Sequence, residues 1–538
     1  MKKLIPGILL ALILAGGMVF VGCKKTDTAG AAGGGTTTSA GSFPIKTDVT
    51  LTYWVPLDAN EYANFTSRGD EPIGKALMER TGVKIEFQHP PANASAEAFN
   101  LMIASGDGLP DMIERTWITD YVGGPEKAIA DGVIIKLNDA IDKWSPNLKA
   151  YLEAHPDYAR MARSDEGSYY AYPFFRDGDK LHYSQGLMIR KDWLDELGLQ
   201  PPSTIPEWHD VLVAFRDRKG IKGPYTQSWG NNARMFVPSF GILKNWYIGA
   251  EDGKIRFGQI EPGYRRWIET MAQWYKEGLI DPDIISLTTA QQNAKMSNGS
   301  AGATVASGGS GMGTWTPAAR QTTPKYEILA LDFPTLTKGE KRVYSITGQV
   351  YTSQGGAAIT TACKNVEIAA RFLDYGYTQE GHLLYNFGIE NESYTMVNGK
   401  PTYTPDILAG GPNKWPLAQA LSAYVRSTGA GPFAQDEGYI EQYYTLPEQK
   451  QLLINYVVPG ADKYVLPAVT ATPAESRELA TILNDINTFH DETVARWLVG
   501  TDPVNDTTWN KYVTTIKGMN IDRAIAIQTD ALDRYNKR

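Results

Sequence analysis

Residues Tyr169–Phe215 read YYAYPFFRDGDKLHYSQGLMIRKDWLDELGLQPPSTIPEWHDVLVAF. The aromatic start predicts a strand that is broken at Pro173, because proline cannot donate a hydrogen bond to a strand ladder. A second, apolar strand is predicted at Gly186–Arg190, followed by a short helix at Lys191–Leu197. The segment Thr204–Glu207 has the form of a capping box with proline in the first turn, so it predicts the start of another helix.

Upstream of this stretch, predicted strands and helices alternate. Strands are expected at Val49–Val55, Val83–Phe87 and Asp111–Glu114, and helices at Pro72–Arg80 and Ser95–Ser105. Strands that alternate with helices favour βαβ units and a parallel sheet. The sequence therefore predicts an α/β fold.

The residues YAYPFF at 170–175 and GLMIRKDWLDELGLQPPSTIPEWHDVL at 186–212 resemble the crossover region of extracellular solute-binding proteins of family 1. These are the carbohydrate receptors of bacterial ABC importers. Other segments match in the same order: GDGLPDMI at 106–113, GLIDP at 278–282, TTACKNVEIAARFLDY at 360–375, GIE at 388–390, and the closing helices at 497–535. The resemblance is to the branch of about this length that takes oligosaccharides.

This resemblance implies a two-lobed periplasmic-binding-protein fold of type 2, with hinge-connected lobes and a mainly helical C-terminal region. The first lobe is expected at 49–175, the second at 176–328, and a return to the first lobe at 329–390. That return is expected to begin with strands at Tyr326–Pro334 and Arg342–Thr360. Residues 391–538 are expected to be mainly helical and largely part of the second lobe.

The N-terminus has the pattern of an export signal. Lys2 and Lys3 precede an apolar run, so residues 1–22 are predicted to be a signal peptide. The run ends at Cys23 in a sequence that resembles a lipobox, which predicts lipidation of that cysteine. Residues 24–48 begin with a stretch rich in Gly, Ala, Thr and Ser, which predicts a flexible tether. The alternative is plain secretion with cleavage at another small residue.

Composition excludes several classes of protein. The 538 residues carry a net charge of −8, which argues against a nucleic-acid-binding surface. If Cys23 is lipidated, the only other cysteine, Cys363, has no disulfide partner. Cys363 is therefore predicted to be a buried apolar residue.

Aromatic residues make up 11% of the chain, and they are the main candidates for ligand contacts. Sugar rings present an apolar face that packs on aromatic rings, and strand ends line the crevice of an α/β sheet. The aromatic candidates are Trp54, Trp117, Phe174, Trp229, Trp246, Trp315 and Tyr351. The polar candidates are Glu114, Arg115, Arg176, Asn231 and Glu390. Arg115 and Arg176 could pair with uronic carboxylates, bond to hydroxyls, or brace the hinge.

The segment Ser307–Trp315 reads SGGSGMGTW, and its glycines would let the backbone approach a ligand closely. It resembles the Gly-Pro-Trp passage of the maltose receptors, in which a tryptophan stacks on sugar. The resemblance implies that Trp315 does so here, and that its loss weakens sugar binding without unfolding the protein. The alternative is a glycine-rich surface loop with an incidental tryptophan.

Signals for metals, cofactors and catalysis are missing from the sequence. Many long oligosaccharide receptors hold a calcium loop after the helix that ends near Phe215. Here Asp217–Gly223 lacks alternating oxygen ligands and contains two lysines and an arginine, so no calcium is expected. Neither a zinc motif nor a nucleophile elbow is found, and no cofactor is expected.

The resemblance implies a monomeric receptor that binds an oligosaccharide between its lobes, closes, and docks on the transmembrane subunits of an ABC permease. The expected location is the outer face of the cell membrane, through the lipid anchor. Two alternatives stay open. One is a receptor for peptides or another solute on the same fold. The other is a surface-anchored glycosidase or lyase, which would need a pair of catalytic carboxylates.

Overall fold

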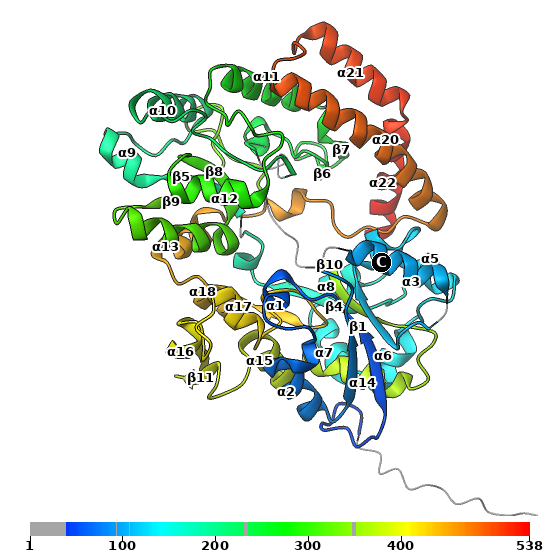
Figure 1. Ribbon diagram of the computed structural model, residues 1–538. Helices are drawn as coiled ribbons and strands as arrows, with labels where there is room; N and C mark the ends of the chain where they lie inside the picture. The colour runs from blue at the N-terminus through cyan, green and yellow to red at the C-terminus, as the bar shows by residue number, and fades with distance from the viewer. Residues whose placement is uncertain (1–38, 93, 107, 184, 231–234, 347–350) are drawn as a thin grey trace, which may run out of the picture. The chain divides into compact units, whose positions relative to one another are not determined.

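The larger of the two main sheets in the computed structural model orders its strands β13-β4-β10-β3-β1-β2. Figure 1 labels β1, β4 and β10 of this sheet. The structure describes residues 39–92, 94–106, 108–183, 185–230, 235–346 and 351–538, with the side chains of 351–355 excepted. The strands are β1 (Thr50–Trp54), β2 (Lys84–Gln88), β3 (Met112–Arg115), β4 (Tyr172–Asp177), β10 (Tyr351–Ile359) and β13 (Ala434–Asp436). β1 is parallel to β2 and β3, whereas β10 is antiparallel to β3 and β4.

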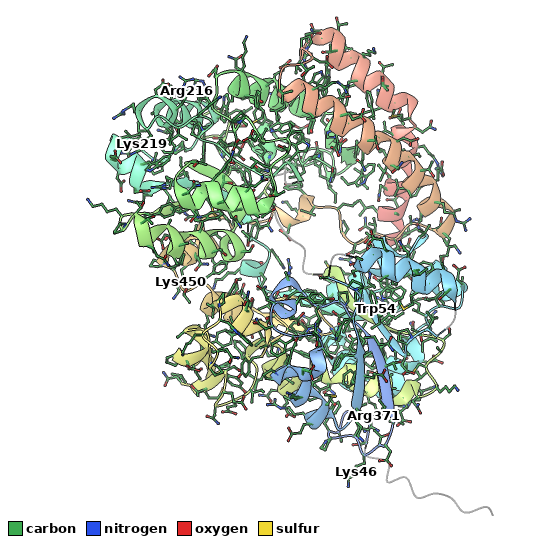
Figure 2. The ribbon with its side chains drawn as sticks, in the orientation of Figure 1. Lys46, Trp54, Arg216, Lys219, Arg371 and Lys450 are labelled. Carbon is green, nitrogen blue, oxygen red and sulfur yellow. The ribbon has the colours of Figure 1, made fainter. Side chains whose placement is uncertain are left out.

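Alternation along β1 explains why this sheet is buried on both faces. Leu51 and Tyr53 pack into the apolar cluster on one face, and Trp54 packs into a second cluster on the other. Side chains two residues apart share a face, so β1 contributes to both clusters. Figure 2 labels Trp54 at the end of this strand.

The second main sheet is antiparallel, in the order β8-β5-β9. Its strands are β5 (Gln185–Arg190), β8 (Ala303–Ser307) and β9 (Ile328–Leu331). The strand predicted at Tyr326–Pro334 was expected in the first lobe, and that prediction is wrong. β9 pairs with β5 because Ile328 and Ala330 bury their side chains in the same apolar cluster as Met188 of β5. The chain rejoins the larger sheet at β10, within the predicted strand Arg342–Thr360.

Helices make up most of the remaining described chain. Before β4 lie α1 (Ala59–Tyr62), α2 (Pro72–Thr81), α3 (Ser95–Ser105), α4 (Trp117–Asp120), α5 (Gly124–Ala130), α6 (Asn138–Trp144), α7 (Pro146–Ala154) and α8 (Pro156–Ala162). Between β5 and β10 lie α9 (Lys191–Leu197), α10 (Ile205–Arg218), α11 (Pro262–Lys276), α12 (Thr289–Asn298) and α13 (Gly313–Thr322). A hairpin of β6 (Trp246–Ile248) and β7 (Ile255–Phe257) precedes α11.

The segment Tyr169–Phe215 folds largely as predicted. The aromatic strand is β4, but the break predicted at Pro173 is wrong, because β4 begins at Tyr172 and continues through Pro173 to Asp177. Pro173 lies where the β4–β10 register shifts, so the strand tolerates its missing N–H. α9 matches its predicted bounds and ends at Gly198, which has a left-handed backbone. Thr204 caps α10 by accepting a bond from the Glu207 amide at 3.2 Å, and the Glu207 carboxylate accepts one from the Thr204 amide at 3.1 Å.

The C-terminal part contains α14 (Val366–Asp374), α15 (Gln379–Phe387), α16 (Pro405–Leu408), α17 (Leu417–Ser422), α18 (Glu437–Tyr443), α19 (Pro447–Asn455), α20 (Pro473–Leu498), α21 (Asp506–Gly518) and α22 (Ile521–Tyr535). A hairpin of β11 (Tyr394–Val397) and β12 (Lys400–Tyr403) follows α15. Residues 391–538 were expected largely in the second lobe, but β13 pairs with β4 in the larger sheet.

The last helices reach back to the residues before β4. Arg534 and Arg538 each pair with Asp165 at 2.6 Å. α20 to α22 also supply apolar side chains, among them Trp497 and Tyr512, to the cluster that covers β5 and α10. Among the described residues, no helix combines the length and apolar character that a membrane crossing needs.

Candidate functional site

Two cavities adjoin at the strand ends, and three residues, Arg176, Thr428 and Gly429, line both. The first has a volume of about 400 Å³ and lies against residues that end or follow β1 and β3. The second has a volume of about 210 Å³ and includes Ser307 at the end of β8. Ligands of α/β proteins bind outside the carboxyl ends of strands. Strand ends from both sheets meet at this position, so we take the paired cavities as the candidate site.

The first cavity is lined by charged side chains that are joined in buried pairs. Arg426 lies 2.7 Å from Glu114, and both side chains are more than nine-tenths buried. The Tyr53 hydroxyl donates to the same carboxylate at 2.7 Å. Burial lowers the pKa of Arg426, but attraction to Glu114 and Glu61 outweighs burial and raises it above its ordinary value. Arg68 pairs with Glu61 at 2.9 Å in the same way.

The side chain of Glu71, which interacts electrostatically with Arg68 and Arg426 of this cavity, has no hydrogen-bond partner among the described residues. Its side chain is fully buried, and neither carboxylate oxygen has a donor. Burial raises the pKa of Glu71 to about 8, against an opposing attraction from Arg68. Burial therefore favours the protonated form of this carboxyl group.

Arg115 is held against an aromatic surface at the end of β3. Its guanidinium pairs with Asp120 at 2.6 Å and donates to the Ser95 hydroxyl at 2.8 Å. The guanidinium carbon lies 5.1 Å from the centre of the Phe99 ring and 5.9 Å from that of Trp54. Two pairings and two ring contacts fix this side chain, so it forms a rigid part of the cavity wall.

The second cavity combines hydroxyls and tyrosines. Ser307, Gly309 and Ser310 come from the glycine-rich segment, and Tyr439 and Tyr443 come from α18. The rings of these two tyrosines are stacked with their centres 5.6 Å apart. Tyrosine faces and serine hydroxyls are the two kinds of group that a sugar ring needs.

Comparison with known proteins identifies the family. The model of the bacterial extracellular solute-binding protein matches residues 62–382. This chain belongs to that family. Proteins of this family are carriers and not enzymes, so the chain is a carrier.

Individual relatives cover most of the chain. It is 26% identical to the fructooligosaccharide ABC transporter substrate-binding protein FusA of Streptococcus pneumoniae, over 92% of each chain. It is 24% identical to lipoprotein LipO of Bacillus subtilis, over 72% of this chain and 74% of that one. The crystal structure of the alginate-binding protein AlgQ2 without calcium ion superposes with a TM-score of 0.74 at 26% identity, covering 90% of this chain and 98% of that one.

The structure brings three of the predicted site residues of this solute-binding protein together. Glu114, Arg115 and Arg176 line the first cavity, and Arg176 also lines the second. The glycine-rich segment lines the second cavity, and its glycines make room for neighbouring tyrosines. A close approach of its backbone to a ligand stays a prediction. A Cβ at Gly308 would lie 2.6 Å from the Tyr444 hydroxyl, and one at Gly309 would lie 2.7 Å from the Tyr443 ring. Because these two glycines have no side chain, Tyr443 of α18 and the following Tyr444 can pack closely against the glycine-rich segment.

The other predicted residues lie elsewhere. Trp54, Trp117, Phe174 and Trp315 are buried in apolar clusters, so none offers a ring face to either cavity. Trp229 and Trp246 are half-buried against the cluster that covers α10 and α11. Glu390 is exposed and lines a separate cavity. Cys23, Asn231 and the side chain of Tyr351 lie outside the described residues.

Among the lining residues that sequence reasoning missed are Glu61, Arg68, Arg426 and Tyr443. The segment YIEQYY at 439–444 did carry a signal, because Tyr439 and Tyr443 are four residues apart and share a helix face. No sequence pattern points to Arg68 or Arg426. Arg426 pairs with Glu114, which is 312 residues away, and Arg68 pairs with Glu61, which belongs to no recognisable motif.

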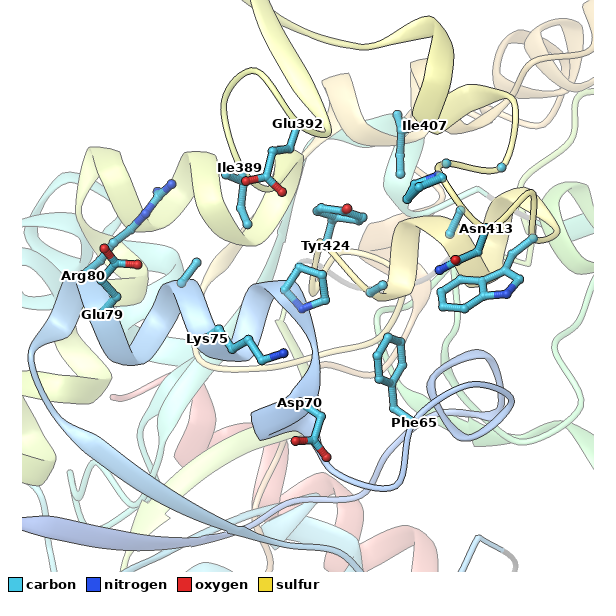
Figure 3. Close-up of a pocket in the computed structure, with 18 residues that line it drawn as sticks. Phe65, Asp70, Lys75, Glu79, Arg80, Ile389, Glu392, Ile407, Asn413 and Tyr424 are labelled. Atoms are coloured by element: carbon cyan, nitrogen blue, oxygen red, sulfur yellow. The ribbon is translucent and has the colours of Figure 1, made fainter.

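A further cavity, shown in Figure 3, shares no lining residue with the candidate site. It has a volume of about 650 Å³ and lies between α2 and the residues around Trp415. The ring of Trp415 meets that of Phe65 edge-on, with centres 5.8 Å apart. Lys75 and Tyr424 also line it, but none of the strand ends reaches it.

In the segment Asp217–Gly223, which was expected to bind no calcium, the acidic residue Asp217 forms an ion pair. Asp217 accepts a bond from Arg216 at 2.6 Å, and both side chains are substantially exposed. Within the described residues, no group of three or more metal-ligating side chains is found. The absence of calcium stays a prediction.

Proposed function

We propose that this chain is the substrate-binding subunit of an ABC importer, and that it captures an oligosaccharide in the two cavities at the strand ends. One observation carries the proposal: strand ends from both sheets line adjoining cavities that combine tyrosine faces, hydroxyls and an arginine. Similarity to FusA over 92% of the chain supports an oligosaccharide as the class of ligand.

Transport requires that the ligand favours a closed state. In the proposed mechanism, the lobes move about the segments that cross between the two sheets, one of which follows Arg176 at the end of β4. A ligand can drive closure only if it makes contacts in the closed state that it lacks in the open one. Groups of both sheets contact it at once, and the closed form then docks on the transmembrane subunits of the permease.

The proposal places the protein at the outer face of the cell membrane. Export through residues 1–22 and lipidation at Cys23 would leave residues 24–48 as a tether. Similarity to lipoprotein LipO supports this arrangement. A tethered monomer stays close to its permease and still moves freely enough to collect ligand.

The test is a thermal-shift screen of the exported chain carrying Cys23→Ser, against neutral and uronic-acid oligosaccharides, with product analysis of each mixture. A raised melting temperature with the sugar recovered intact is the expected result. Cleaved sugar would show an enzyme instead. If no glycan shifts the melt and a peptide does, the receptor class is wrong.

Tyr443→Ala sharpens the screen. Tyr443 is half-buried and lines the second cavity, so its loss should weaken sugar binding roughly five- to fiftyfold while the melting temperature without ligand changes little. Arg523→Gln serves as the control, because Arg523 of α22 forms an exposed pair with Glu478 of α20 and lines neither cavity.

A further inference from the structure

Building on the proposed function, we propose that the transported oligosaccharide is anionic, and that one of its uronic-acid carboxylates pairs with Arg176 where the two cavities join.

Four arginines line the two cavities, and three of them have carboxylate partners. Arg68 pairs with Glu61, Arg426 with Glu114, and Arg115 with Asp120, all within 2.6–2.9 Å. Among the described residues, Arg176 has no carboxylate within ion-pair distance. Each positive charge of the site is therefore compensated by the protein except the one that both cavities share.

Two further carboxylates, that of Asp177 next to Arg176 in the sequence and that of Asp58 in the wall of the first cavity, have other partners. Asp177, its neighbour on β4, accepts hydrogen bonds from the Tyr151 and Tyr158 hydroxyls at 3.1 Å each. Asp58 accepts from the backbone amides of Asn60 and Glu61 at the start of α1. Neither is arranged to neutralise the Arg176 guanidinium.

Burial makes this lack of a partner costly. The Arg176 side chain is half-buried, and burial lowers its pKa below the ordinary value. In the second cavity it is the only charged residue among the described residues that line the wall. A desolvated guanidinium without a counter-charge is unfavourable, and a carboxylate that accepts two parallel hydrogen bonds relieves it.

The remaining groups fit the rest of a sugar ring. Ser307, Ser310 and Gln435 can bond to hydroxyls, and Tyr443 can offer its ring face. A neutral sugar would satisfy these groups but would leave Arg176 uncompensated in a closed, drier site. Because the whole chain carries a net charge of −8, its long-range field does not attract anions, so selectivity for an acid must come from local contacts.

The experiment measures affinity by calorimetry on the exported chain with Cys23→Ser. The probes are trisaccharides of galacturonate, mannuronate and guluronate, each with its methyl ester, and neutral fructo- and malto-oligosaccharides. The expected result is that at least one acid binds and that esterifying it weakens binding roughly tenfold to a hundredfold, which is the usual strength of one charge-assisted contact.

Variants then assign the effect to Arg176. Arg176→Gln should weaken the acid by a similar factor and change the affinity of its methyl ester by less than about twofold. Arg176→Lys should restore part of the loss, because it keeps the charge without the planar fork. Arg523→Gln, in the exposed pair with Glu478, should leave both affinities unchanged.

The outcomes separate this proposal from the proposed function. Binding of neutral sugars with no preference for acids would overturn the anionic ligand and leave the sugar receptor standing. An equal loss for acid and ester in Arg176→Gln would also overturn it, because the residue would then serve hydroxyls or the hinge. If no sugar binds at all, both proposals fail. Should Arg176→Gln not fold, the acid and ester pair on the unaltered site decides.

Discussion

The two walls of the candidate site differ in how they are made rigid. Toward the larger sheet, side chains of opposite charge are paired beneath the surface, as in Arg426 with Glu114 and Arg68 with Glu61. In the second cavity, the wall consists of serines, glycines and stacked tyrosines, and Arg176, which comes from β4 of the larger sheet, is the only charged residue among the described lining residues. One wall holds fixed charges, and the other offers ring faces and hydroxyls.

This difference separates stability from recognition. A buried ion pair orients its members but contributes little net stability, because desolvation offsets the attraction. Its value here lies in pairing three of the four lining arginines within the protein, so that Arg176 is the arginine left for a ligand. The opposite wall depends on close packing, since its glycines bring α18 against the segment that follows β8. Charge changes should therefore disturb the first wall, and changes of volume the second.

Arg426→Met tests the charged wall and has the largest expected effect. It removes one member of a buried pair at nearly constant volume and leaves Glu114 with only the Tyr53 hydroxyl. Such a change costs about 3–5 kcal/mol in the free energy of unfolding. Urea denaturation measures it. The double variant with Glu114→Gln should recover much of the loss, and a single variant as stable as the original chain would contradict the pairing argument.

Trp315→Ala tests the packed wall. Only 1% of the Trp315 surface is exposed, and the ring lies in the apolar cluster beneath the second cavity. Truncating such a side chain leaves a large cavity and costs about 3–5 kcal/mol. The sequence-based expectation was weaker sugar binding without unfolding. A variant of unchanged melting temperature that fails to bind sugar would favour that earlier expectation over the buried position.

Glu71→Gln tests the charged wall through the pH dependence of the free energy of unfolding. The pKa of Glu71 is raised in the folded state, so the unfolded chain releases this proton first as pH rises. The stability of the unaltered protein should therefore fall between the unfolded pKa of this group and its folded pKa of about 8. The slope is about 1.4 kcal/mol for each pH unit, and the glutamine variant lacks it.

Urea denaturation at pH 5 and at pH 8 measures this difference. The advantage of Glu71→Gln over the unaltered chain should grow with pH. Glu79→Gln on the same helix removes an exposed carboxylate and serves as the control. An advantage for Glu71→Gln that is equal at both pH values would show that burial does not hold this proton.

Local chemistry made much of the fold predictable. The capping box at Thr204–Glu207 and the left-handed Gly198 are signals within a few residues, and both formed as expected. The partner of a strand is a different matter. β9 was assigned to the wrong sheet because the sequence of a short apolar strand does not say which neighbour will share its cluster.

Residues of the candidate site could be predicted only where charged residues stand at the end of an apolar strand. Glu114, Arg115 and Arg176 were found because polar residues after an apolar run are conspicuous. The tryptophans were misleading, since a large ring at a strand end can turn into the interior, as Trp54 and Trp117 do. Their direction depends on packing against helices far along the chain, which no local pattern reports.

Gly308→Ala tests the packed wall with the smallest change, a single methyl group. Its Cβ would lie 2.6 Å from the Tyr444 hydroxyl and 2.9 Å from Leu452, both buried, so α18 or α19 must shift. Overpacking of this kind costs about 1–3 kcal/mol. Gly518→Ala is the matched control, because that helical glycine faces open space and the change should stabilise by about 0.5–1 kcal/mol. If both variants gain stability, the wall is looser than its close contacts indicate, and the contrast with the charged wall would lose its basis.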